Sequence, residues 1–253
     1  MEHFYPRTKK GLLIIIDQRF TKKGKIPNSN EEDIEKIRHT FQSLGYQIHN
    51  IYDFKNLQAH QLVKKFKSTV LKYHLEKDSF GRHLYDCLVV VVLSFAFENN
   101  YIAASDGDFI IDKLYEIVEN YFVDIPKIFI FRTPNIKEKT NGIAEVVFEV
   151  SEDDDDIRNN EETCVYIPDK PDHLVIINSH PLQKDLNSES GWRSDFIDNL
   201  TKLINAASVN EKRCNVHILS LLIQLNSHLA QKEPFDQEYG MMPLHCTFST
   251  LKK

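Results

Sequence analysis

The sequence predicts an α/β domain in which helices cover both faces of a mostly parallel sheet. The first observation is an apolar run at residues 87–93, which is continuous, rich in valine and without a helical period. Strands in the middle of a parallel sheet have this pattern, because both of their faces are covered. The second observation is that strand-like and helix-like segments alternate along most of the chain. Such an order indicates right-handed crossovers and a doubly wound sheet.

The first half of the chain supplies most of the predicted elements. Asn30 is the expected N-cap of the first helix, since three acidic residues follow it where the helix dipole is positive. Gly45 ends that helix, because glycine readily adopts the conformation that closes a helix. The predicted strands lie at residues 12–17, 46–52, 87–93 and 127–131, with an extended segment at 101–104 and a turn at 106–107, and the predicted helices lie at 31–44, 57–75 and 110–121.

The second half is smaller and follows an acidic block. Residues 145–162 carry four consecutive aspartates and further glutamates, so the block is expected to repel itself and to form a mobile linker. A calcium loop is the alternative, although the acidic residues lack alternate spacing and a turn glycine. Beyond the block, strands are predicted at residues 172–178 and 243–251, and helices at 195–207 and 216–230. These elements are too few for an independent domain and are expected to extend the first sheet.

Composition and charge exclude several classes of function. The net charge of −6 at pH 7 argues against a nucleic-acid or anionic-membrane surface. No apolar run approaches the roughly 18 residues of a membrane span, and the N-terminus has no signal-peptide pattern, so a cytoplasmic protein is expected. The cysteines lie far apart without metal-ligand spacing, and we expect no metal, no cofactor and no disulfide framework. They are Cys87, Cys164, Cys214 and Cys246, of which Cys87 is expected to be a small core residue.

The carboxyl end of the central strand is where an open α/β sheet places its ligand site. Ser94 ends the strand here and is followed by Phe95, Ala96 and Phe97. None of these last three residues is an acid, a base or a nucleophile. His180 follows the end of a later strand, but spacing pairs no cysteine or serine with it, so we interpret it as a loop histidine.

Short stretches along the whole chain resemble the caspases. They lie at residues 10–20, 41–46, 92–94, 105–107, 126–129 and 242–251, in the same order as in that family. The resemblance implies a caspase-like three-layer α/β/α sandwich around a six-stranded, mostly parallel sheet. It also implies a large-subunit-like half at residues 1–144, an acidic intersubunit linker at 145–165 and a small-subunit-like half at 166–253, which together form one domain without a prodomain.

The catalytic residues of that family are replaced in this chain. The resemblance places the family's histidine and the glycine after it at Phe95 and Ala96, and its nucleophilic cysteine at Pro134. Phenylalanine cannot accept a proton, and proline has neither a nucleophile nor a backbone N–H. The resemblance therefore implies a pseudoenzyme that lacks the Cys/His dyad and has no catalytic residue. A protease with a relocated cysteine–histidine pair is the alternative.

The specificity pocket is changed as well. Caspases hold the aspartate of a substrate with two arginines and a glutamine. The resemblance places Pro27 and Ser188 at the arginine positions and Arg132 at the glutamine position. Arg193 is a candidate for a displaced second arginine, since it follows Trp192 as the family's arginine follows a tryptophan. We nevertheless interpret Arg132 and Arg193 as surface arginines, because isolated arginines usually are.

The expected function is regulation of an active caspase, and thereby of apoptosis, by heterodimerisation, with an increase of the partner's activity as the favoured effect. The alternatives are an inhibitory decoy that forms inactive dimers and a binding module that uses the degenerate cleft without a caspase partner. The resemblance implies dimerisation through the last strand, and a homodimer is a further expectation. Cys246 in this strand is either an apolar filler or a residue that cross-links protomers under oxidation. The expected interface residues are Leu244, His245, Cys246, Thr247 and Phe248.

Overall fold

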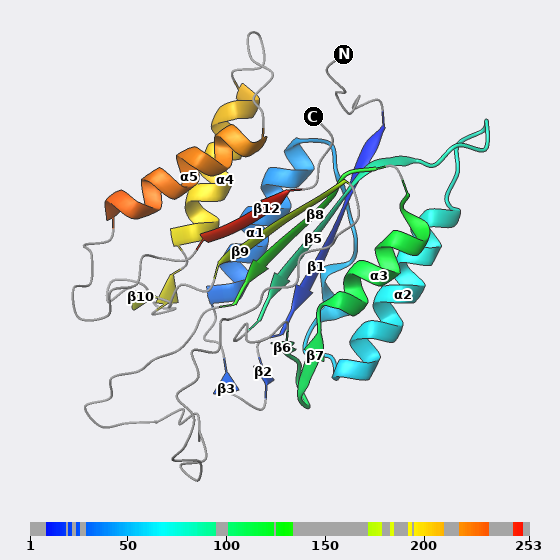
Figure 1. Ribbon diagram of the computed structural model, residues 1–253, viewed down its shortest axis with the longest axis horizontal. Coiled ribbons are helices and arrows are strands. Elements are labelled where there is room, and N and C mark those ends of the chain that lie inside the picture. Colours follow the sequence, from blue (N-terminus) through cyan, green and yellow to red (C-terminus); the bar gives the residue numbers. More distant parts are fainter. Residues whose placement is uncertain are drawn as a thin grey trace.

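The computed structural model has a central sheet between two layers of helices (Figure 1). α2 (Ala59–Leu75) and α3 (Asp112–Tyr121) cover one face of the sheet. α1 (Ser29–Ser43), α4 (Asp195–Val209) and α5 (Ile218–Lys232) cover the other face, which gives the three-layer α/β/α arrangement expected from the sequence. The structure describes residues 9–18, 20–21, 24–25, 29–94, 101–123, 125–133, 172–178, 183–184, 192–193, 195–209, 218–232 and 245–249.

The sheet has six strands in the order β12-β9-β8-β5-β1-β4. All neighbouring strands are parallel except β12 and β9, which are antiparallel. The predicted six-stranded, mostly parallel sheet is therefore confirmed, and strands from beyond the acidic block extend it. The strands are β1 (Lys10–Asp17), β4 (Gln47–Ile48), β5 (Tyr85–Leu93), β8 (Lys127–Arg132), β9 (His173–Asn178) and β12 (His245–Ser249).

β5 is a central strand, and its side chains contribute to both halves of the core. Leu88 and Val90 pack with residues of α2 and α3, whereas Val89 and Val91 pack with residues of α1 and α4. Successive side chains of a strand point to opposite faces, so a strand that is covered on both faces needs an apolar residue at every position. Cys87 is buried at the start of this run, which confirms its predicted place in the core.

α1 ends at a left-handed glycine, as the sequence predicts. Gly45 has a φ of 78°, and its N–H donates to the carbonyl of Gln42 at 3.0 Å. The N–H of Tyr46 donates to the carbonyl of Phe41, also at 3.0 Å. These two bonds close the last turn of the helix. The Tyr46 ring then covers Gly11 of β1, where any Cβ atom would overlap with the ring.

Two predictions for this region are wrong in detail. The predicted N-cap Asn30 lies inside the first turn of α1, because the helix already begins at Ser29. The predicted strand at residues 46–52 is reduced to β4, and the 3₁₀ helix η1 (Ile51–Phe54) follows it. The Asn50 side chain accepts a hydrogen bond from the backbone N–H two residues later, at 3.2 Å, and this local bond starts a helical turn in place of a longer strand.

A hairpin follows the central strand, where the sequence predicts an extended segment, a turn and the start of a helix. β6 (Tyr101–Ala103) pairs antiparallel with β7 (Asp108–Ile110). The Asp106 side chain accepts a hydrogen bond from the N–H of Ala59 at 2.8 Å and so satisfies an open donor at the start of α2. The remaining strands form two-residue pairs, namely β2 (Phe20–Thr21) with β3 (Gly24–Lys25), and β10 (Gln183–Lys184) with β11 (Trp192–Arg193).

Some predictions fall on residues that the structure does not describe. The acidic block and the two boundaries drawn at residues 145 and 165 are among them, so the mobile linker and the calcium alternative stay predictions. Within the described ranges, no helix has both the length and the apolar character that a membrane span requires. The cytoplasmic location also stays a prediction.

Candidate functional site at the carboxyl edge of the sheet

The carboxyl ends of the adjacent parallel strands β1, β5, β8 and β9 carry buried polar residues. The register places Leu93 of β5 level with Asp17 of β1 and with Arg132 of β8. Asn178 of β9 is level with Arg132, so the four ends meet at one edge of the sheet. This is the edge at which open α/β sheets bind ligands. The buried polar residues here are Asp17, Gln18, Ser94, Arg132, Thr133 and Asn178.

Ser94 is held by two hydrogen bonds at the end of the central strand. Its N–H donates to the carbonyl of Arg132 at 3.1 Å, and its Oγ donates to the carbonyl of Ala103 at 2.6 Å. The residue is buried, and its hydroxyl proton is directed at a carbonyl rather than at a base. Ser94 therefore anchors the β6–β7 hairpin to the sheet and lacks the features of an activated nucleophile.

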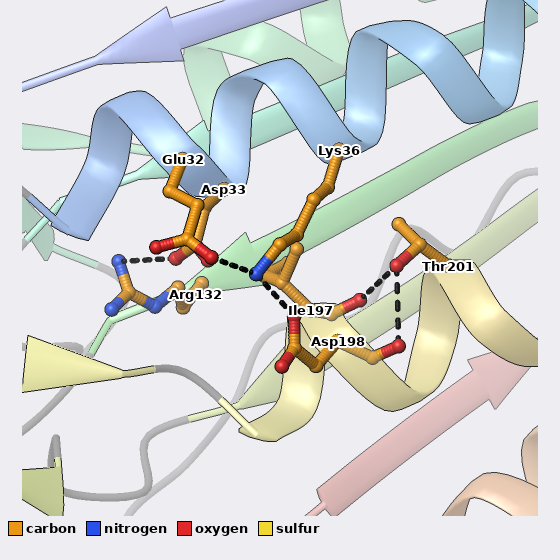
Figure 2. A network of polar contacts seen from close by, with 7 residues as sticks. All are labelled: Glu32, Asp33, Lys36, Arg132, Ile197, Asp198 and Thr201. Atoms are coloured by element: carbon orange, nitrogen blue, oxygen red, sulfur yellow. Dashed lines mark hydrogen bonds and ion pairs between the residues drawn. The ribbon is translucent and has the colours of Figure 1, made fainter. Parts of the chain in front are cut away.

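Arg132 is the largest of the side chains that are fully buried in the described part of the chain. It continues the row of Ile128 and Ile130, whose side chains face α1 and α4. Its Nη1 lies 3.4 Å from Oδ2 of Asp33 on α1 (Figure 2). Burial lowers the pKa of Arg132, while the carboxylates of Asp33 and Asp17 act in the opposite direction. The interpretation of Arg132 as a surface arginine is therefore wrong, because the side chain enters the core toward a carboxylate.

Asp33 is the buried partner of this ion pair. Burial raises its pKa to about 6, although the positive charges of Arg132 and Lys36 oppose the shift. Its Oδ2 accepts no hydrogen bond from the described residues, so the ionised form gains only a part of the stabilisation that a hydrogen-bonded carboxylate receives. The raised pKa makes this carboxyl group less acidic than an exposed aspartate, although it is in direct contact with the arginine.

A second ionic contact connects α1 to α4 beside this pair (Figure 2). Nζ of Lys36 lies 2.6 Å from Oε1 of Glu32 and 2.5 Å from Oδ1 of Asp198. Burial lowers the pKa of Lys36, but the bonds to the two carboxylates outweigh it and raise that pKa overall. Further along the same two helices, Nδ2 of Asn205 donates to Oγ1 of Thr40 at 3.2 Å. Polar contacts therefore accompany the apolar seam between the two halves of the chain.

Several predicted site residues lie outside the described residues. Of Arg193, by contrast, the structure describes the backbone, which lies in β11 and pairs with Gln183 of β10. The predicted replacement of the dyad and of the pocket therefore rests on the sequence. The predicted residues that the structure does not describe are Phe95, Ala96, Pro134, Pro27, Ser188, Leu244, Cys164, Cys214 and His180.

β12 forms one edge of the sheet. It pairs with β9, from His245 opposite Asn178 to Ser249 opposite Leu174. As the first strand in the sheet order, it has no second partner strand among the described residues. The predicted interface residues between His245 and Phe248 thus lie on a strand whose second backbone edge is unshared within the described part of the chain.

Asp33 is among the residues of this site that sequence reasoning misses. The sequence assigns it to the acidic first turn of a helix, where it complements the helix dipole. It also precedes Ile34 directly and lies four residues before Ile37, which places it beside the apolar stripe of α1. Acidic residues are rarely buried without a partner, so an acid in this position indicates a cation inside the fold.

Comparison with known proteins agrees with this architecture. The family model described as Caspase domain matches residues 10–252. A solved structure described as "structure of pro-sf-caspase-1" superimposes with a TM-score of 0.71 and 19% sequence identity, over 99% of this chain and 91% of that chain, and at this identity the likeness shows the fold alone. No match is found among curated proteins. Because the family match extends over nearly the whole sequence, the chain belongs to the caspase domain family.

Proposed function

We propose that this chain is a catalytically inactive caspase homologue that regulates an active caspase, and through it apoptosis, by forming a heterodimer. The observation that carries the proposal is that the family resemblance aligns Phe95 with the catalytic histidine and Pro134 with the catalytic cysteine. Cysteine proteolysis needs a thiolate and an imidazole within reach of proton transfer. Phenylalanine accepts no proton, and proline supplies neither a sulfur atom nor a backbone N–H for an oxyanion. A neighbouring residue could rescue one such loss, but the loss of both partners removes the chemistry.

The edge strand β12 supports the formation of a dimer. An unshared strand edge exposes N–H and C=O groups that pair readily with another strand. A second chain with the same last strand can pair with β12 around a two-fold axis, since each strand then presents the same edge to the other. Because β12 continues the central sheet, such pairing would extend one sheet through both chains. An active caspase is a partner that offers this matching strand.

An inactive chain can alter its partner's activity by binding alone. If the partner exchanges between an active and an inactive arrangement, a bound chain shifts this equilibrium by its difference in affinity for the two. We favour an increase in activity, because the chain keeps strands from both halves and the terminal strand in a continuous sheet. No peptide cleavage by the chain itself is needed for this effect.

Titration of a purified active caspase with this chain tests the proposal. We expect the caspase's turnover of a fluorogenic aspartyl substrate to rise and to saturate as the heterodimer forms, with the complex measured by native mass spectrometry. Cys246→Arg should abolish both effects, because it places an unpaired charge in the strand that pairs. Ile223→Arg is the matched control. Ile223 lies on α5 and is 70% exposed, so this arginine should leave both effects unchanged.

The possible outcomes separate the competing functions. A fall in turnover on formation of the heterodimer would identify the inhibitory decoy. If the chain forms no complex with any caspase tested, the proposal fails, and a binding module that uses the degenerate cleft without a caspase partner becomes the better explanation. An unchanged effect of the Cys246→Arg variant would move the interface away from β12.

A further inference from the structure

Arg132 places a fixed positive charge at the carboxyl edge of the sheet. Its strand β8 lies between β5 and β9, and its backbone carbonyl accepts a hydrogen bond from Ser94, so the residue cannot shift without displacing the sheet. The side chain is 1% exposed. A buried guanidinium requires a negatively charged or strongly polar partner, because burial of an unpaired charge is very unfavourable.

The ionisable groups around Arg132 and its partner Asp33 come from α1, β1 and α4 of the same chain. Asp33 of α1 is in contact with it, and Asp17 of β1 acts on it electrostatically. Asp33 in turn faces Arg132, the neighbouring Glu32 and Lys36 on its own helix α1, and Asp198 of α4. The guanidinium is therefore paired with a carboxylate from within the fold, and its fork has the geometry that binds carboxylates.

The exposure of Asp33 distinguishes its role from that of its neighbours. The Glu31 and Glu32 side chains on the same helical turn are 64% and 55% exposed, as expected of acids that only complement a helix dipole. The Asp33 side chain is 4% exposed. An acid whose only role is the helix dipole has no need to be buried, so the burial of Asp33 is explained by its contact with Arg132.

We infer that Asp33 is a built-in ligand of Arg132, an intramolecular carboxylate that occupies the arginine and so prevents this position from recognising an acidic side chain of a bound peptide. The inference deepens the proposed function, since it concerns the position that the family resemblance aligns with the glutamine of the specificity pocket. It rests on the proposed function only for the assignment of Arg132 to a position of the specificity pocket. The contact itself can be tested with the purified chain and no caspase, so its failure and that of the proposed function are distinguishable.

Rescue by a small carboxylate tests whether Asp33 acts as a ligand. Asp33→Ala leaves a space of about one carboxyl group beside the guanidinium. We expect sodium formate to raise the melting temperature of this variant by several degrees in a saturable way, compared with sodium chloride at the same ionic strength. The parent chain and the double variant Asp33→Ala with Arg132→Gln should show no such difference. An equal response to formate in all three proteins would overturn the inference.

A double-mutant cycle gives a second test that survives poor folding of the alanine variant. Asp33→Asn keeps the shape of the side chain and Arg132→Gln removes the charge. At a pH well above 6, we expect the double variant to lose less stability than the sum of the losses of the two single variants, because each single variant already removes the attraction between the two charges. The coupling should vanish well below pH 6, because Asp33, whose pKa is raised to about 6, is then neutral.

An exposed ion pair provides the control for this cycle. Arg38 contacts Glu35 on the outer side of α1, and Arg38→Gln with Glu35→Gln should show little coupling at either pH. Additive effects of the Asp33 and Arg132 substitutions at both pH values would show that the two residues are neighbours without an ionic bond and would end the inference.

Discussion

The Nζ atom of Lys36 on α1 lies 2.5 Å from Oδ1 of Asp198 on α4, in a contact between residues that are 162 positions apart. Asp198 is 6% exposed in its side chain, whereas Lys36 keeps 28% of its side chain accessible. The acidic block lies between the two residues in the sequence. The bond therefore ties the two halves of the chain together across the seam of α1 and α4, independently of the peptide segment that joins them.

Substitution of this lysine should weaken the seam. Lys36→Met keeps the apolar stem and removes the charge, which leaves a largely buried carboxylate with one cation fewer. We expect a loss of about 1 kcal/mol in the free energy of unfolding, discounted for the partial exposure of the lysine. Urea unfolding of the parent and the variant measures it. Arg38→Met, which breaks the exposed pair with Glu35, is the control and should have no measurable effect. Equal losses in the two variants would contradict a special role for the seam contact.

A second prediction concerns the close approach of Gly11 and Tyr46. A Cβ at Gly11 would overlap the Tyr46 ring, which the end of α1 holds over β1. Gly11→Ala should therefore lower the free energy of unfolding by about 1–3 kcal/mol, because either the ring or the strand must shift. Gly107→Ala is the matched control, since a Cβ there meets no atom within 4 Å. Comparable loss in the two variants would show that chain entropy or strand propensity, rather than the ring, decides the effect.

His49 gives the stability of the fold a dependence on pH. Its Nδ1 lies 3.0 Å from the Tyr73 hydroxyl, and its Nε2 lies 3.1 Å from Oδ2 of Asp53. Burial lowers the pKa of His49 below its usual 6.5, although Asp53 opposes the shift. The unfolded chain therefore binds the proton more tightly than the folded chain does, and stability falls as pH decreases below about 6.5.

The variant His49→Gln should lose this dependence. Glutamine cannot take up a proton, so the difference in stability between the parent and the variant should be largest above pH 6.5 and should shrink as the pH falls toward the lowered pKa of the histidine. Denaturant unfolding at a series of pH values measures the difference. His39→Gln serves as a comparison on another element. A constant difference between the parent and His49→Gln at all pH values would mean that the histidine contributes through packing alone.

The elements that the sequence predicts well are those whose pattern is local. The valine run of β5 identifies a strand covered on both faces, and Gly45 marks the end of α1, because strand periodicity and left-handed glycines act within a few residues. Some of the missed features depend on distant partners. Asp106 satisfies a donor at the start of α2, which lies 47 residues earlier, and this contact leaves no trace in the periodicity of either segment.

The candidate site shows the same division. The sequence predicts that the carboxyl end of the central strand, at Ser94, marks the ligand edge, since strand ends follow from the apolar runs. It misplaces Arg132 at the surface, because residue type alone favours exposure. Asp33 is the partner that reverses this preference, and it lies on α1, far from β8 in the sequence. The burial of the arginine is thus a property of the packed fold, and only the position of Asp33 beside the apolar stripe indicates it.

The last prediction concerns peptide cleavage. The chain should show no turnover of aspartyl peptides, and the double substitution Phe95→His with Pro134→Cys should restore little or none. A restored thiolate and imidazole should still lack a pocket for the substrate's aspartate, because the family resemblance aligns Pro27 and Ser188 with the two arginine positions. Arg132 cannot replace them, since it is buried against Asp33. Turnover by purified double variant, measured with a fluorogenic aspartyl peptide and compared with the two single variants, tests this. Vigorous turnover that a thiol alkylator abolishes would show that the specificity pocket survives and that only the dyad has been lost.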